Sequence, residues 1–406
     1  ERSRGLGDVY KRQKKNNAAT RKYQAFITRY NIYYNGDTHY KETLKEMEDG
    51  YQDDYSSLLL IHPAVARGNS KAPQPSGNFD RSIEKAQKAI QLRSIKKKPK
   101  KQPGKSSDPA YKEWMKRDEY NPFLHNAWLM MGRSQYLNGD FLGAASTFFY
   151  ISRHFSWLPK TVTEARLWEA RSYLAMDWLF EAETILRRVK PETDLTDGEL
   201  KGLYYTSEAD LLIKEKEWEK GAEMLRMAIP HVSKPQRTRL NFLLGQVYSR
   251  AGKKDLAYKA FQAAGGSSSA SYRTKFNARI KQSEVFTGED IAKEVGALRR
   301  MTRYDRNKEY LDQIYYAIGN LYLSRRDTTK AIENYELAVE KSTRSGIDKA
   351  MAQLTLGGLY YDRRLYAKAQ PCYSEALPLI PDNYPDYAVL KRRSDVLDDL
   401  AVYSQN

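Results

Sequence analysis

Five histidines and one cysteine are the side chains of this sequence best suited to metal binding or nucleophilic chemistry. The histidines are His39, His62, His125, His154 and His231, and no two of them stand four residues apart, as a helical pair of metal ligands would. We expect them at surface or capping positions. Cys372 has no histidine near it in the sequence, so we expect a buried or half-buried structural thiol rather than a nucleophile. The sequence therefore predicts no catalytic residue, no metal and no cofactor.

The positive charge of the chain is concentrated in one segment. Of the formal net charge of +17, about half comes from the stretch between Arg93 and Arg117, which holds ten Lys or Arg against Asp108 and Glu113. A basic segment favours acidic proteins, nucleic acid or anionic surfaces as partners. Its Pro, Gly and Ser content fits a solvated linker equally well. Residues 96–107 carry no apolar side chain to bury, so we expect them to be mobile.

A pattern of small and aromatic residues recurs from residue 121 onward. The clearest copy has Gly132, then Tyr136, a turn at Gly139, then Ala144 and Phe148. Small residues allow two helices to cross closely, and a large ring four positions later fills the space toward the next helix. This is the arrangement of a helical hairpin of the tetratricopeptide type.

The hairpin pattern returns at a nearly constant period. Positions equivalent to Ala144 are Ala182, Gly221, Ala257, Ala331 and Ala369, at spacings of 38, 39, 36, 74 and 38 residues. The spacing of 74 contains a degenerate copy between Ser271 and Arg303. Because such hairpins bury their apolar faces only by stacking, the sequence predicts an all-α fold of tetratricopeptide-like helical-hairpin repeats stacked in a right-handed superhelix.

Five segments are predicted along the chain. Residues 1–13 are treated as non-native, 14–50 as an N-terminal helical hairpin around the turn Asn35-Gly36-Asp37, and 51–120 as a loop, a short helix over Arg81 to Ile95 and the basic linker. Residues 121–385 form the repeat array, and 386–406 begin a further, truncated helical unit.

The first segment has a separate explanation. Residues Ser3 to Gln13 can be back-translated into a DNA string that resembles the transposase adapter of short-read sequencing libraries. We therefore expect residues 1–13 to be read-through from a contig edge and exclude them from the fold.

Five polar residues are predicted to bind a partner. They occupy equivalent, inward-facing positions of the first helices of successive hairpins, namely Arg133, Arg171, Gln246, Arg250 and Asn320. Stacking should bring them onto one concave surface. We expect that surface to bind a protein segment of acidic character.

Several segments resemble one known family. They include Arg29 to Gly36, Ile83 to Ile90, Glu119 to Trp128, Tyr150 to His154 and Asp312 to Ala317. In these segments the chain, from Lys14 onward, resembles the PorW/SprE family of tetratricopeptide lipoproteins of the Bacteroidota. The resemblance implies a scaffold for type IX secretion and gliding motility, anchored in the outer membrane by a lipid and facing the periplasm. It also implies a lipid-modified cysteine, which we expect within a few codons upstream of Lys14.

Three classes of function follow from these observations. The first is a non-enzymatic protein-interaction scaffold whose partners are proteins of a secretion or motility complex, with no nucleic acid and no small-molecule substrate. The second is a cytoplasmic helical-repeat adaptor that binds RNA or other acidic partners. Because the charge lies in the linker rather than once in every repeat, it fits a base-reading array poorly. The third, an enzyme with an accessory repeat domain, has no candidate residue in this chain.

Overall fold

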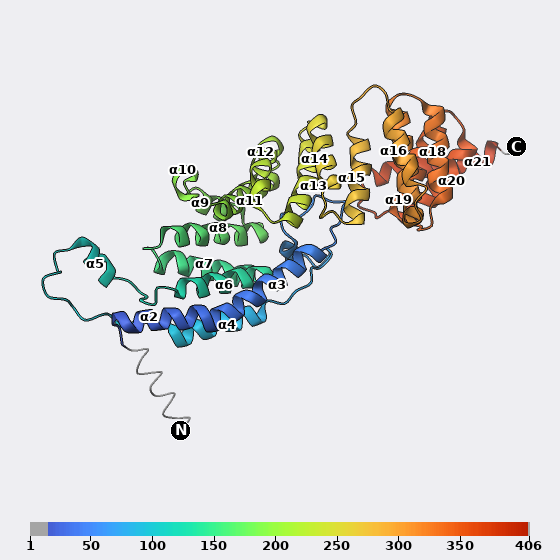
Figure 1. Ribbon diagram of the computed structural model, residues 1–406. Coiled ribbons are helices and arrows are strands. Elements are labelled where there is room, and N and C mark those ends of the chain that lie inside the picture. The colour runs from blue at the N-terminus through green and yellow to red at the C-terminus, as the bar shows by residue number, and fades with distance from the viewer. Residues whose placement is uncertain (1–14, 405–406) are drawn as a thin grey trace. The chain divides into compact units, whose positions relative to one another are not determined.

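The computed structural model describes residues 15–404, and every regular element within that range is a helix (Figure 1). The predicted adapter read-through at 1–13 lies outside the described residues. Within residues 15–404, no helix combines the length and the apolar character needed to cross a membrane. The chain forms two compact units: the first contains the residues up to Gly252 with Ser267–Ser269, and the second contains Lys253–Gly266 and the residues from Ala270 onward.

The first unit opens with one continuous helical rod. Its consecutive parts are α2 (Ala18–Ile27), the π-helical η1 (Thr28–Tyr33) and α3 (Tyr34–Gly50). The predicted hairpin over residues 14–50 is therefore wrong, because Asn35-Gly36-Asp37 is helical. Gly36 serves a close approach instead of a turn: a Cβ there would lie 2.6 Å from Met130 Cε and 3.0 Å from Lys85 Cβ. A glycine inside a helix fits this role wherever a neighbouring helix comes very near.

Residues 51–120 connect the rod to the repeats. They contain the 3-10 helix η2 (Pro63–Gly68), α4 (Asp80–Arg93) and α5 (Pro109–Met115). The short helix predicted over Arg81 to Ile95 is confirmed by α4, which packs on α3, η1 and α6. Residues 96–107 contain no helix and expose every lysine, and their mobility stays a prediction.

Three hairpins and three further helices complete the first unit. The hairpins pair α6 (Leu124–Leu137) with α7 (Phe141–His154), α8 (Pro159–Ala175) with α9 (Leu179–Leu186), and α11 (Gly198–Lys214) with α12 (Trp218–Ala228); α10 (Pro191–Asp194), η3 (Ile229–His231) and α13 (Lys234–Arg250) complete the set. Within the unit each helix packs mainly on its neighbours in sequence. Such local packing is the pattern of a repeat protein.

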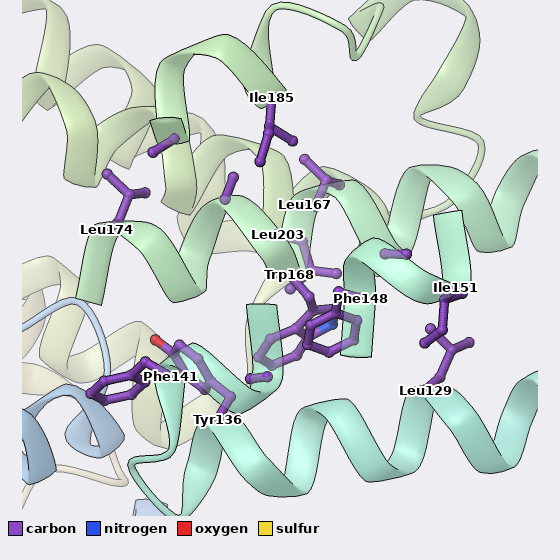
Figure 2. Packing of buried hydrophobic residues seen from close by; sticks show 14 of the residues in the cluster. Leu129, Tyr136, Phe141, Phe148, Ile151, Leu167, Trp168, Leu174, Ile185 and Leu203 are labelled. Carbon is purple, nitrogen blue, oxygen red and sulfur yellow. The ribbon is translucent and has the colours of Figure 1, made fainter. Parts of the chain in front are cut away.

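The predicted interlocking of small and aromatic residues is confirmed. A Cβ at Gly132 would lie 2.6 Å from the Phe148 ring, so only glycine lets α6 approach α7 this closely. Figure 2 shows Phe148 beside Trp168 and near Tyr136, and the Phe148 and Trp168 ring centroids are 5.9 Å apart. Burial of these rings supplies much of the core of the unit.

The second unit continues the same architecture. It contains α14 (Lys254–Gly266), α15 (Tyr272–Glu284), α16 (Ala292–Met301), η4 (Asp305–Tyr310), α17 (Leu311–Ser324), α18 (Thr328–Lys341), α19 (Ile347–Asp362), α20 (Tyr366–Ala376), η5 (Leu377–Leu379) and α21 (Tyr387–Ser404). The degenerate copy forms α15 and α16, and α21 occupies the predicted further helical unit. A Cβ at Gly319 would lie 2.5 Å from the Tyr335 ring, which repeats the interlocking of Gly132 with Phe148.

The array predicted over residues 121–385 is thus shared between two units. The sequence pattern contains no signal for this division. In a repeat array each hairpin packs on the adjacent hairpins. The sequence period is therefore the same whether two adjacent hairpins pack extensively or sparsely.

The turns inside the hairpins repeat as well. A residue with positive φ ends the first helix at Gly139, Asp177, Lys216, Gly252, Arg326 and Arg364, with φ between 59° and 86°. These positions lie five residues before the small residues from which the period was derived, so they have the same spacings. A residue in the left-handed region ends a helix because the amide that follows it can then donate a hydrogen bond to a carbonyl of the last helical turn. Asp140 N donates in this way to Gln135 O at 2.9 Å.

Candidate binding cavity

Residues 51–62, which we call the strap, run in a largely extended conformation along α13 of the first unit. Arg239 of α13 donates to both carboxylate oxygens of Asp53, from Nη2 at 2.7 Å and from Nε at 2.8 Å. Its Nη2 also donates to the Leu60 carbonyl at 2.8 Å. The Arg239 and Asp53 side chains are only 8% and 4% exposed. A paired, bidentate contact of this kind fixes the position of the strap.

The strap is also held through its backbone. The Gln246 side chain donates to the Ser57 carbonyl at 2.8 Å and accepts from the Leu59 amide at 3.0 Å. The rings of Tyr55 and Phe242 lie 5.0 Å apart. Gln246 was predicted to face an open concave surface, but the strap covers it. Contacts between residues so far apart in sequence leave no periodic signal.

A cavity of about 480 Å³ opens beside the strap. It is bounded by α3 and the end of the strap, and by the first helices of the hairpins, α6, α8 and α11, together with α13. A volume of this order suits a small ligand or a few side chains. The cavity can therefore accept part of a peptide but not a folded domain.

Arg133 of α6 is buried at the cavity wall. Its Nη1 lies 3.2 Å from Glu164 Oε1, with the two side chains 14% and 12% exposed, and its guanidinium lies 5.2 Å from the Tyr40 ring centroid. Its Nε has no hydrogen-bond partner among the residues that the structure describes. Because the charge is already paired, Arg133 chiefly ties α6 to α8.

Arg171 of α8 lines the same cavity without an ion pair. Its guanidinium lies 4.7 Å from the Trp168 ring centroid and 5.7 Å from that of Tyr136. Among residues 15–404, no carboxylate lies within ion-pair distance of it. Aromatic faces orient a guanidinium while leaving its N–H groups free to donate. Arg171 interacts with the Tyr136 hydroxyl and, electrostatically, with the buried Asp210 carboxylate, but it forms no direct ion pair among the described residues. It can therefore also receive an anionic group that enters the cavity.

The carboxylate of Glu48 is engaged within the protein. It lies 3.2 Å from His62 Nε2 and accepts from Ser233 Oγ at 2.5 Å. Burial alone would raise the pKa of Glu48, but its interactions with His62 and Ser233 and the nearby positive charge of Arg239 together outweigh burial and lower it. Burial lowers the pKa of His62, so its ring is neutral and its Nδ1 accepts from the Ala64 amide at 3.1 Å. His62 thus caps η2, as expected for a histidine here, and Glu48 is not placed as a general base.

The remaining reactive groups also have structural positions. Within residues 15–404, no group of His, Cys, Asp and Glu is placed to hold a metal ion. Cys372 is half-buried in α20, as predicted, and burial raises the pKa of its thiol to about 11. A thiol with so high a pKa is a weak nucleophile at neutral pH.

The five predicted partner-binding residues do not form one group. Arg133 and Arg171 line the cavity, and Gln246 lies under the strap. Arg250 is exposed with its guanidinium 5.6 Å from the Trp218 ring centroid, outside the lining of the cavity. Asn320 belongs to the second unit, where it accepts from Tyr335 Oη at 2.6 Å. Partner binding by any of the five stays a prediction.

Comparison with known proteins supports the repeat assignment in one place. Residues 312–340 match the family profile described as tetratricopeptide repeat. These residues span most of α17 and α18 of the second unit. No curated protein was found to match this sequence.

Three solved structures show a weak likeness to the tetratricopeptide-like array. The apo form of the quorum sensor NprR from B. thuringiensis is 13% identical, with 67% of this chain and 80% of that chain covered and a TM-score of 0.42. NprR in complex with its cognate peptide NprX is 14% identical, with 60% and 73% covered and a TM-score of 0.33. The APC/C hetero-tetramer Cut9-Hcn1 is also 14% identical, with 78% and 52% covered and a TM-score of 0.33. Similarity at this level transfers no function.

Sequence reasoning missed one whole side of the cavity. Tyr40 and Glu48 of α3, His62 at the end of the strap and Ser233 before α13 all line it. A signal was present in the rod, where Tyr40, Thr43 and Met47 are buried at the three- and four-residue spacing of a helix face. That spacing shows a face that packs on something, but not which helices it meets.

Proposed function

We propose that this chain is a non-enzymatic scaffold that binds a segment of another protein in the cavity of the first unit. The observation that carries the proposal is Arg171, a cation on an aromatic platform that lines a cavity. Among the described residues it forms no direct ion pair, although the Asp210 carboxylate interacts with it electrostatically. Its N–H groups are matched by a carboxylate of the partner. The aromatic walls accept apolar parts of the same segment.

Site-specific photo-cross-linking tests this proposal. A photoreactive amino acid at Lys41, which lines the cavity and is 73% exposed, should capture a discrete partner in extracts of the cells that carry the gene. Lys45 is the matched control, because it stands one turn further along α3, is 79% exposed and does not line the cavity.

The decisive comparison adds Arg171→Ala. Loss of a charge-assisted hydrogen bond should weaken capture at Lys41 roughly tenfold. The cross-linked partner segment should contain Asp, Glu or a free carboxyl end. Two results would contradict the cavity as the binding site. One is equal cross-linking yield from Lys41 and Lys45, and the other is a yield at Lys41 that Arg171→Ala does not change.

We further propose that the partner belongs to the type IX secretion and gliding machinery, and that the protein is a lipid-anchored component of the outer membrane facing the periplasm. This proposal rests on the sequence resemblance to the PorW/SprE family. Deletion of the gene should abolish secretion through that machinery, and complementation with Arg171→Ala should restore it incompletely. Normal secretion after deletion would contradict the role in secretion. It would not contradict the scaffold proposal, which the cross-linking experiment tests separately.

A further inference from the structure

Two adjoining cavities lie in the second unit where the repeat pattern is degenerate. One, of about 270 Å³, is lined by residues of α15, α16 and η4 and by Tyr304; the other, of about 420 Å³, is lined by residues of α14, α15 and α16 and by Tyr304. They share Arg279, Met301 and Tyr304, so they form one cleft.

The cleft exists because the α15–α16 pair is not closed like the other hairpins. α16 spans only ten residues and packs mainly on α17, through Val295 and Leu298 rather than through an aromatic ring. Gly296, the glycine of α16, has open space at its Cβ position, so no glycine crossing brings α15 and α16 together. Places where a regular pattern fails are often functional, because the regular packing has been given up there.

The lining of the cleft is strongly basic. Four exposed cations line it, namely Lys275, Lys293, Arg300 and Arg306, and none of them forms an ion pair with a residue in the described part of the chain. Glu294 is the one carboxylate that lines either cavity. It is already engaged, by Arg279 Nη2 at 2.6 Å and by Tyr258 Oη at 2.6 Å. The unmatched charge of the cleft is therefore positive, which attracts anions.

Aromatic side chains lie between these cations. Tyr272 and Phe276 of α15 line the smaller cavity, and Tyr304 is 55% exposed. The Arg306 guanidinium lies 5.0 Å from the Tyr272 ring centroid and 5.7 Å from that of Tyr304. Tyr272 Oη donates to the buried Asn307 side chain, which joins α15 to η4. The aromatic surface is thus held in place rather than loose.

We propose that this cleft binds an acidic peptide, a segment with several carboxylates and at least one aromatic or large apolar side chain. The carboxylates meet the four unpaired cations, and the apolar side chain packs on the tyrosines. Single-stranded nucleic acid offers similar chemistry, but it needs a basic track over several nucleotides. Here the unpaired cations gather in one repeat, which favours the peptide.

Fluorescence anisotropy on the intact chain tests the proposal. The probe is a labelled peptide, EEYEELEE, and its counterpart with every Glu replaced by Gln. The acidic peptide should bind and the Gln peptide should not. The double variant Lys275→Ala/Arg306→Ala should weaken binding roughly tenfold or more, since it removes two charge-assisted contacts.

Matched controls separate this cleft from general charge and from the first unit. Lys391→Ala/Arg392→Ala removes two exposed charges from α21 of the same unit and should leave binding unchanged. The weakening caused by Lys275→Ala/Arg306→Ala should be the same in the wild type and in the Arg171→Ala background, which distinguishes the cleft from the cavity of the first unit. If the Lys275/Arg306 variant melts early, Lys293→Ala/Arg300→Ala replaces it, because both side chains are exposed.

Three results would overturn the proposal. One is equal weakening by the α21 control, which would mean diffuse electrostatic attraction. Another is equal binding of the Gln peptide. The third is tighter binding of a labelled oligouridine of eight nucleotides with the same dependence on Lys275 and Arg306, which would assign the cleft to nucleic acid.

Discussion

At the scale of single residues, burial decides which side chains respond to pH. His125, in the first turn of α6, is half-buried with its ring 6.3 Å from that of Phe155, and burial lowers its pKa to about 4. The folded protein disfavours the protonated form of this imidazole, so folding becomes less favourable at a pH where the free imidazole is protonated. The unfolded chain, with an ordinary histidine pKa of about 6.5, gains that proton first.

His125 therefore contributes stability above pH 6.5 that is lost as the pH falls toward 4. By linkage the loss amounts to roughly 3 kcal/mol over that window. Urea unfolding at pH 7 and pH 4 should show this loss in the wild type and a smaller loss in His125→Gln, since glutamine does not titrate.

The difference between the two proteins is the informative quantity. Burial raises the pKa of Glu169 to about 7, so that carboxyl stabilises the fold on acidification and partly masks His125. Identical pH profiles for the wild type and His125→Gln would show that the ring is solvated in the folded protein.

At the scale of elements, the hairpin turns carry unequal strain. Gly139 and Gly252 adopt positive φ without a steric cost, whereas Lys216, Arg326 and Arg364 adopt φ of 60° with a Cβ present. The cost for a residue with a side chain is about 1–2 kcal/mol.

Lys216→Gly, Arg326→Gly and Arg364→Gly should each stabilise the protein by about 0.5–1 kcal/mol, after the greater freedom of glycine in the unfolded chain is subtracted. Thermal or urea unfolding of each variant measures the change. Gly139→Ala is the converse control, because φ is +86° and the new Cβ would lie 2.7 Å from Arg67 Cβ. A stabilising Gly139→Ala would contradict this account of the turns.

The strap is held to α13 mainly by one buried ion pair. Asp53→Ala leaves the buried Arg239 guanidinium without its carboxylate, so the free energy of unfolding should fall by about 3–5 kcal/mol. Asp54→Ala, at the exposed neighbouring position, removes only local hydrogen bonds that Asp54 accepts from Ser56 and Ser57, and should cost about 1 kcal/mol or less. Chemical denaturation of both variants makes the comparison. Similar losses would mean that the Arg239 contact does not hold the strap.

At the scale of the whole molecule, stability is distributed along the chain rather than collected in one core. Each helix packs mainly on its neighbours in sequence, and the chain forms two compact units. In such proteins a defect weakens adjacent repeats and fades with distance along the array.

Phe148→Ala should therefore act locally. Removing a fully buried ring costs about 3–5 kcal/mol, and amide hydrogen exchange should speed up in α6, α7 and α8. Exchange in α18, α19 and α20 of the second unit should change little. Equal acceleration in all six helices would show that the chain unfolds as a single cooperative body.

The sequence alone determined the repeating part of this protein. Gly132 with Phe148, and Gly319 with Tyr335, identify hairpins because both members of each pair lie within one repeat, and a fixed period links one repeat to the next. The same local information placed α4 and predicted a structural Cys372. The prediction from local sequence was wrong at Gly36. A glycine can either form a turn or allow a neighbouring helix to approach closely, and the sequence does not distinguish these two roles.

Only the tertiary structure decided where the candidate sites lie. The pair Asp53 and Arg239 is separated by 186 residues, and the first cavity takes walls from both the N-terminal rod and the repeats. The cleft of the second unit arises from a hairpin that does not close. Contacts of this range depend on how whole helices pack, and neither hydrophobic period nor residue spacing records which distant segment covers a given face.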